Sequence, residues 1–569
     1  MTVLQERPEA QAVPARRPAA AAEPVDMWFD TSDHKRIGLL FIYASLLFVV
    51  ASAVAGVIVA AKQASPSLGL TASRFDRLYG MHTQSGILLF LTAIWIGLAT
   101  YLVPLQIGAG RLALPRLSAM GFWIYLFGGI CFMVSYLIGQ VNGLGITQAT
   151  PIVALAGGAT RATTLWIVSL ALVSVGFLLA LVSLLATIAG LRTEGMTLLR
   201  VPAFTWATLV TAAITMVATP VFLGGLLLLG VDQYFGGKLF DPSVAGNLAI
   251  WQRSIWLYGR PDVYLLTIMA LGAGSDIVAT HARRPLINHR AVLVLLGLLG
   301  ALSLGSWAAG TSVVDAVIVP TFNVVTGLVV IPLGMTLLMW LATAGLGRPK
   351  PHVSLLFVAG AIGLWVIGAA NAIGAGFHHV AGFHGASSWV AGNVHTVIVG
   401  PPTLLAFGAL YHWGPKIWGR KLSGGLGSLA FLCLFGGLAA SGLAYYFLGY
   451  NGLSLGLTTN LTSYQKNLYV IAEVGGVLIA LGAVLVIIDL VLAMASSGTS
   501  AGDDPYEGLT LEWATTSPPP AWGFDAVPEV RSEAPLHYLR HARDVDGAGA
   551  SAGTGGAAGA GALGTGSRS

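Results

Sequence analysis

Residues 77–105, RLYGMHTQSGILLFLTAIWIGLATYLVPL, decide the class of fold. After Arg77 the stretch contains no Asp, Glu, Lys or Arg, and it exceeds the roughly 20 apolar residues that a helix needs to cross a bilayer. The apolar residues do not alternate with polar ones, as they would in a strand of a membrane barrel. His82 lies near one end of this apolar segment, and a polar group in hydrocarbon is a functional hypothesis by default. The stretch therefore predicts a transmembrane helix that carries a functional histidine.

Apolar stretches of this length recur along the whole chain. The sequence is 55% hydrophobic and 9% charged, whereas a soluble domain carries about a quarter charged residues. We therefore predict an all-α membrane protein, a bundle of twelve transmembrane helices. The expected helices lie near residues 36–61, 78–105, 117–140, 162–190, 201–231, 254–279, 290–310, 317–345, 352–376, 386–413, 426–450 and 467–494.

The charge pattern of the loops predicts the orientation of this bundle. Lys and Arg are more frequent in the segments on the N-terminal side of the membrane than in the opposite ones, so both termini are expected in the cytoplasm. Residues 1–30 contain no apolar core of a signal peptide. The net charge of +5 fits a membrane surface with its lipids and gives no indication of nucleic acid.

Four regions are expected along the chain. Residues 1–30 form a disordered cytoplasmic segment, residues 31–497 the twelve-helix membrane domain and residues 498–544 a cytoplasmic tail, while residues 545–569 form a Gly/Ala-rich disordered end.

Two histidines inside predicted helices are candidate metal ligands. His82 lies in the second helix and His395 in the tenth, both towards the outer ends of helices that run from outside to inside. At similar depth, the two imidazoles could bind one haem iron from opposite sides, or each could form an ordinary hydrogen bond between helices.

The other histidines give weaker signals. Three of them, His378, His379 and His384, could bind a metal or belong to a solvated loop. Four others are expected at the inner membrane interface: His34, His281, His289 and His412. Arg260 and Asp262 fall within the sixth helix, where a structural charge pairing and a proton path are both open interpretations.

Several segments together resemble subunit I of the haem–copper oxidase superfamily, the catalytic subunit of cytochrome c oxidases. The resemblance covers most of residues 30–530. The segments that carry it are Ser32–Gly38, Arg77–His82, Tyr101–Ala109, Leu114–Leu117, Gly236–Pro242, Trp256–Tyr264, His412–Pro415 and Thr510–Pro520. The resemblance implies a plasma-membrane respiratory protein with two haems and one copper, which works with further oxidase subunits or a cytochrome electron donor. His82 and His395 match the two axial ligands of the family's low-spin haem.

The sequence departs from the family at the oxygen-reducing centre. The position of the high-spin haem ligand is Asn393, and the three copper-ligand positions are Arg260, Ala308 and Ala309. Alanine has no lone pair to offer, and a guanidinium stays protonated, so none of these three binds copper. Near this centre, Asp262 stands where the family has a glutamate, and the family's tyrosine is kept as Tyr264.

Three functions are compatible with the sequence. The first is a divergent subunit I homologue with one low-spin bis-histidine haem, of b or a type, and no copper, which transfers electrons. The second is an active terminal oxidase with ligands recruited from the cluster His378, His379 and His384. The third is a haem-free structural or transport protein, in which Arg260 and Asp262 line a path.

Overall fold

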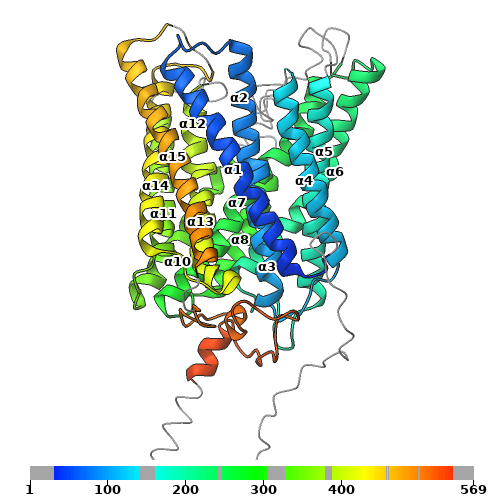
Figure 1. Ribbon diagram of the computed structural model, residues 1–569, viewed down its shortest axis with the longest axis vertical. Helices are drawn as coiled ribbons and strands as arrows, with labels where there is room; N and C mark the ends of the chain where they lie inside the picture. Colours follow the sequence, from blue (N-terminus) through cyan, green and yellow to red (C-terminus); the bar gives the residue numbers. More distant parts are fainter. Residues whose placement is uncertain are drawn as a thin grey trace, which may run out of the picture.

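A computed structural model of the chain describes residues 31–139, 161–240, 246–305, 324–325, 327–377, 387–456, 458, 460–496 and 500–541. This part is a bundle of helices that run roughly along the long axis of the molecule (Figure 1), and it contains no strand. The N-terminal segment 1–30 and the Gly/Ala-rich end 545–569 lie outside the described residues.

The helices follow one another along the chain and include two π-helical turns, η2 and η7, and one 3-10 turn, η8. Their bounds are α1 (His34–Ala64), α2 (Ala72–Gln84), η2 (Ser85–Thr92), α3 (Ala93–Gln106), α4 (Pro115–Ile138), α5 (Arg161–Gly190), α6 (Ala203–Phe235), α7 (Leu248–Ala282), α8 (His289–Gly305), α10 (Val330–Leu346), α11 (Val353–Phe377), α12 (Trp389–Asn393), η7 (Val394–Ile398), α13 (Gly400–Trp418), α14 (Gly424–Tyr450), α15 (Ser463–Ala495) and η8 (Leu511–Ala514).

The predicted twelve-helix membrane fold is confirmed. Within the described residues, ten helical runs are long and apolar enough to cross a membrane, and two shorter apolar helices, α8 and α10, fall on the seventh and eighth predicted spans. The runs α2–η2–α3 and α12–η7–α13 each form a single continuous span. Because hydrocarbon offers no hydrogen-bond partners, most backbone groups of each span are satisfied within the helix itself.

Glycines allow the helices to pack closely. A Cβ added to Gly38 of α1 would lie 2.8 Å from the carbonyl oxygen of Gly97 in α3, and α14 and α15 meet in the same way at Gly437 and Gly475, at 2.6 Å. In a bilayer, helix association depends on such close contact, because lipid and apolar side chains are equally hydrophobic. Glycine at these points brings backbone against backbone and makes the bundle compact.

The π-helical turn at His395 follows from the residues after it. Pro401 and Pro402 have no N–H, so the carbonyl of Val397 has no donor at either position i+4 or i+5. The indole Nε1 of Trp365 in α11 donates to that carbonyl at 3.2 Å. π-helical turns inside α-helices are often found at functional sites, and this one contains a predicted ligand.

Residues 500–541 pack against one end of the bundle, which we call the tail end (Figure 1). Leu511 and Trp513 of this segment are buried. The helices α2 and α12 lie in the half of the bundle remote from the tail end (Figure 1).

Four histidines that the sequence places at a membrane boundary lie inside the protein. His34, His281, His289 and His412 were predicted at the membrane interface, and all four are buried. The prediction did not include the tail segment, whose Tyr506 packs against the rings of His281 and His412.

Candidate functional site

His82 lies in the last turn of α2 with its ring against α1. Its Nδ1 is 2.9 Å from the carbonyl oxygen of Ser52, and a carbonyl can only accept, so Nδ1 carries the proton and donates. The hydroxyl of Ser52 donates in turn to the carbonyl of His82 at 2.9 Å. This pair of bonds fixes both the position of the ring and its tautomer, which leaves the lone pair on Nε2.

His395 lies in η7 and has the same tautomer. Its Nδ1 donates to the carbonyl oxygen of Ala391, one turn earlier, at 2.7 Å. The ring stacks on Tyr445 of α14 with a centroid separation of 5.7 Å and an angle of 28° between the planes. Here too the lone pair is left on Nε2.

The two imidazoles have the donor chemistry that could hold a haem iron. They lie near enough to interact electrostatically, and among the described residues neither Nε2 has a hydrogen-bond partner. Both residues are half-buried, so part of each borders space that protein atoms do not fill. Metal-binding histidines commonly donate their second ring N–H to a carbonyl, which directs the other nitrogen at the metal.

The residues around the predicted oxygen-reducing centre are only partly described. Asn393 ends α12, two residues before His395, and Arg260, Asp262 and Tyr264 lie on α7, but the side chains of these three are not described. Five predicted positions lie outside the described residues: Ala308, Ala309 and the possible recruited ligands His378, His379 and His384. The loss of the copper ligands therefore stays a prediction from the sequence.

A polar cluster lies at the tail end between α3, α7 and the tail segment. Gln106 Nε2 donates at 3.2 Å both to Asp276 Oδ2 and to Glu512 Oε1. Glu512 also accepts from the indole of Trp413 at 3.1 Å, whereas its Oε2 is buried without a partner. Burial raises the pKa of Glu512 above its ordinary value. The cluster joins the tail to the bundle through a carboxyl group that burial favours in its neutral form.

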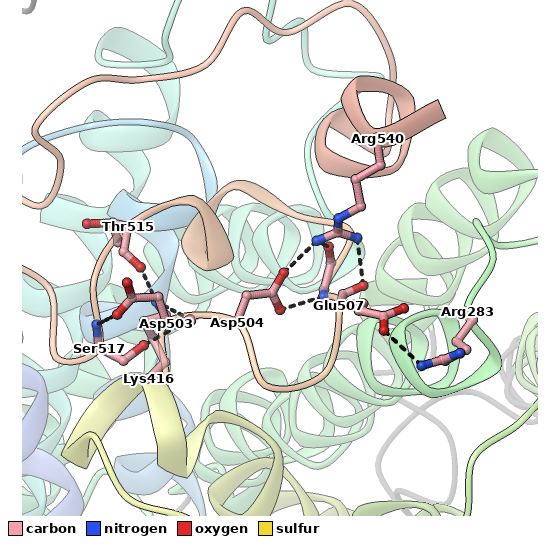
Figure 2. Close-up of polar contacts among 9 residues, drawn as sticks. Arg283, Lys416, Asp503, Asp504, Glu507, Thr515, Ser517 and Arg540 are labelled. Atoms are coloured by element: carbon pink, nitrogen blue, oxygen red, sulfur yellow. Dashed lines mark hydrogen bonds and ion pairs between the residues drawn. The ribbon is translucent and has the colours of Figure 1, made fainter. Parts of the chain in front are cut away.

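Lys416, near the end of α13, binds backbone carbonyl groups of the tail segment. Its Nζ donates to the carbonyl oxygens of Asp503, Thr515 and Thr516 at 3.0, 2.6 and 3.2 Å. Figure 2 shows this contact beside a second one, in which Arg540 reaches Asp504 and the carbonyl of Glu507. The tail segment is therefore closed on itself and attached to the bundle by buried polar bonds.

Three histidines at the tail end form a chain of hydrogen bonds. His281 Nε2 lies 3.2 Å from His412 Nδ1 and 3.0 Å from Ser354 Oγ, which in turn lies 2.7 Å from His352 Nδ1. The rings of His281 and His352 stack at 4.5 Å, so their lone pairs run parallel and do not converge on one ion. In the part of the chain that the structure describes, no group of three or more His, Cys, Asp or Glu side chains is arranged to hold a metal.

Burial keeps His352, at one end of this series of hydrogen bonds, neutral. It lowers the pKa of His352 to about 4, and the nearby Lys421 acts in the same direction. At neutral pH the ring therefore bonds as an uncharged imidazole.

The sequence did not reveal the residues that support the two candidate ligands. Ser52, Gly56 and Tyr445 contact the rings from other helices, and nothing in their local sequence marks them. The tail contacts had a weak signal, because the run Thr510–Trp513 carries two large apolar side chains, Leu511 and Trp513.

The comparison with known families identifies the chain. Residues 36–483 match the family described as cytochrome c and quinol oxidase polypeptide I. The protein belongs to this family. The match covers most of the chain and includes both candidate ligands, His82 and His395.

Related proteins support this membership in the oxidase polypeptide I family. The chain is 30% identical over 538 residues to a putative cytochrome c oxidase subunit 1-beta of Streptomyces avermitilis, covering 92% of this chain and 95% of the relative. It is 30% identical over 529 residues to cytochrome c oxidase subunit 1 of Corynebacterium glutamicum, covering 92% and 90%. A heme-copper terminal oxidase dimer solved by cryo-EM has the same fold, with a TM-score of 0.68, 16% identity and 89% of each chain covered.

Proposed function

We propose that this oxidase polypeptide I homologue holds one low-spin haem between His82 and His395 and transfers single electrons without reducing oxygen. The observation that carries the proposal is the matching tautomer of the two rings. Nδ1 of His82 donates to the carbonyl oxygen of Ser52 at 2.9 Å, and Nδ1 of His395 donates to that of Ala391 at 2.7 Å. Each Nε2 is thereby left ready to bind iron.

The haem iron would supply a reversible one-electron couple, and the chain would supply its ligands and a water-poor setting. His82 comes from α2, and His395 from η7, which directly follows α12; α2 and α12 lie in the half of the bundle remote from the tail end (Figure 1). If His82 and His395 both held the iron, the chain would leave no open position on it for oxygen. Arg260, Ala308, Ala309 and Asn393 support the second half of the proposal, because none of them can replace an imidazole at the family's other metal positions.

This function implies particular surroundings. The protein is a multi-span protein of the bacterial plasma membrane, and we infer that both its termini face the cytoplasm. The haem site would then lie towards the outer face, where a cytochrome or a second oxidase-type subunit exchanges electrons with it.

Purification of the full chain from membranes tests the proposal. We expect one b- or a-type haem per chain, no stoichiometric copper and no carbon monoxide adduct in the reduced state. His82→Ala and His395→Ala should each abolish the low-spin spectrum. A large carbon monoxide shift in the unmutated protein would contradict the closed iron site.

A second function has support from the comparisons. Relatives in Streptomyces avermitilis and Corynebacterium glutamicum carry the name cytochrome c oxidase subunit 1 and align over 92% of this chain. An active oxidase would show copper and cytochrome-dependent oxygen uptake in the same preparation. A preparation with neither haem nor copper would instead support a structural or transport role.

A further inference from the structure

Tyr445 of α14 supports the ring of His395 from a neighbouring helix. The two rings stack at a centroid distance of 5.7 Å with their planes 28° apart, and Tyr445 is 9% exposed. The hydrogen bond of His395 runs to Ala391 within its own helical turn. That bond orients the imidazole relative to its own helix, whereas Tyr445 orients it relative to the rest of the bundle.

Gln63 of α1 holds the tyrosine in place. The hydroxyl of Tyr445 donates to Gln63 Oε1 at 2.8 Å, and Gln63 Nε2 donates to the carbonyl of Gly456 at 3.1 Å. Gln63 is only 4% exposed, so water does not compete freely for these bonds. Both polar ends of the glutamine are used, and its side chain is fixed from both sides.

The same helix also supports the other candidate ligand. Ser52 of α1 accepts the Nδ1–H of His82, and Gln63 stands eleven residues, about three turns, further along α1. One helix thus contacts His82 directly and contacts His395 through Tyr445.

We propose that Tyr445 and Gln63 form a positioning pair that fixes the orientation of the His395 imidazole about the iron–nitrogen axis. The inference rests on the proposed haem ligation by His82 and His395. The stacked phenol limits rotation of the imidazole, and the bond to Gln63 limits movement of the phenol. Loss of the bond gives the imidazole a wider range of angles and a higher rate of release from the iron.

The test compares Tyr445→Phe, Gln63→Leu and the double variant by electron paramagnetic resonance of the oxidised haem. A wider spread of imidazole angles broadens the low-field signal, so both single variants should broaden it. The double variant should match the single ones, because all three lose the same bond. Tyr450→Phe is the matched control, since it removes a tyrosine hydrogen bond from the same helix, to the carbonyl of Asn371 at 2.9 Å, without a ring contact to His395.

A second readout follows release of the ligand. Carbon monoxide should bind a measurable fraction of the reduced haem in Tyr445→Leu, which loses the stacked ring, and none in Tyr450→Phe. Unchanged signals in both Tyr445→Phe and Gln63→Leu, beside a normal low-spin haem in the unmutated chain, would overturn the positioning pair alone. Broadening in the double variant that equals the sum of the broadening in the two single variants would also overturn it. A haem-free unmutated chain would overturn the proposed function and the pair together.

Discussion

A Cβ placed on Gly56 of α1 would lie 2.6 Å from both Cε1 and Nδ1 of the His82 ring. The Nδ1 and Cε1 atoms of the imidazole therefore lie against a part of α1 that has no side chain. This close approach lets Nδ1 reach the carbonyl of Ser52, one turn earlier, at 2.9 Å.

Gly56→Ala should displace this ring and lower the haem content. The added methyl group overlaps the imidazole, so either the ring turns away from Ser52 or the two helices separate. We expect loss of most of the low-spin Soret absorbance per mole of protein, although alanine is the better helix former by about 1 kcal/mol.

Gly224→Ala is the matched control, because a Cβ there meets nothing within 4 Å. It should leave the spectrum unchanged. An unchanged spectrum in Gly56→Ala would show that His82 does not bind iron in the orientation seen here.

The membrane fold and the depth of the two histidines could be predicted because both depend on the position along a helix. A long apolar run fixes where a span begins and ends, and the order of spans then brings His82 and His395 to one half of the bundle. The contacts of Ser52, Gly56 and Tyr445 depend on how each helix is rotated about its axis. That rotation is set by contacts between helices, such as the close contact of Gly38 with Gly97. The sequence of a single span does not encode such contacts.

The tail contacts were not foreseen for a different reason. The twelve spans account for the composition of the chain, so residues 498–544 were predicted only as a cytoplasmic tail, with no contact to the bundle assigned. Their attachment depends on a lysine inside the last turns of α13 and a glutamine at the end of α3, each of which is ordinary at the end of a membrane helix.

Lys416→Met should detach the tail segment. The variant removes three donors from the carbonyls of Asp503, Thr515 and Thr516, and one such bond to a charged group contributes about 1.5–3 kcal/mol. We expect proteolysis within residues 500–541 to become much faster. Lys421→Met is the control, because Lys421 touches the tail only over the ring of Tyr506, at 5.7 Å, and it should change the rate little. Equal rates in the two variants would contradict the role of Lys416.

Docking of the tail should weaken as pH rises. Burial raises the pKa of Glu512, so the docked state holds the proton more tightly than the free tail does. The contribution is fully present below the ordinary pKa of Glu512, near 4.5, and it is lost as pH rises through the docked value. Asp276 faces the same carboxyl group and repels its charged form, while Lys416 attracts it.

Glu512→Gln tests this dependence, since the amide keeps the acceptor for Gln106 and Trp413 but does not ionise. Tail proteolysis, normalised to the activity of the protease at each pH, should accelerate with pH in the unmutated chain and stay flat in the variant. Parallel curves for the two proteins would exclude Glu512 as the titrating group.

Trp365→Phe should destabilise the turn that holds His395. The carbonyl of Val397 receives its hydrogen bond from the Trp365 indole at 3.2 Å, because Pro401 and Pro402 have no N–H to offer. Leaving a buried acceptor without a donor costs about 1–3 kcal/mol, and this partly buried carbonyl should lose part of that, so the melting temperature of the haem absorbance should fall.

Pro401→Ala supplies the specific control for that prediction. It restores a backbone N–H four residues after Val397, which can take over the bond that Trp365 makes. Trp365→Phe should therefore lower the melting temperature less in the Pro401→Ala background than in the unmutated chain. If the melting temperature falls equally in both backgrounds, the indole stabilises this turn by packing, and its hydrogen bond to the carbonyl of Val397 contributes little.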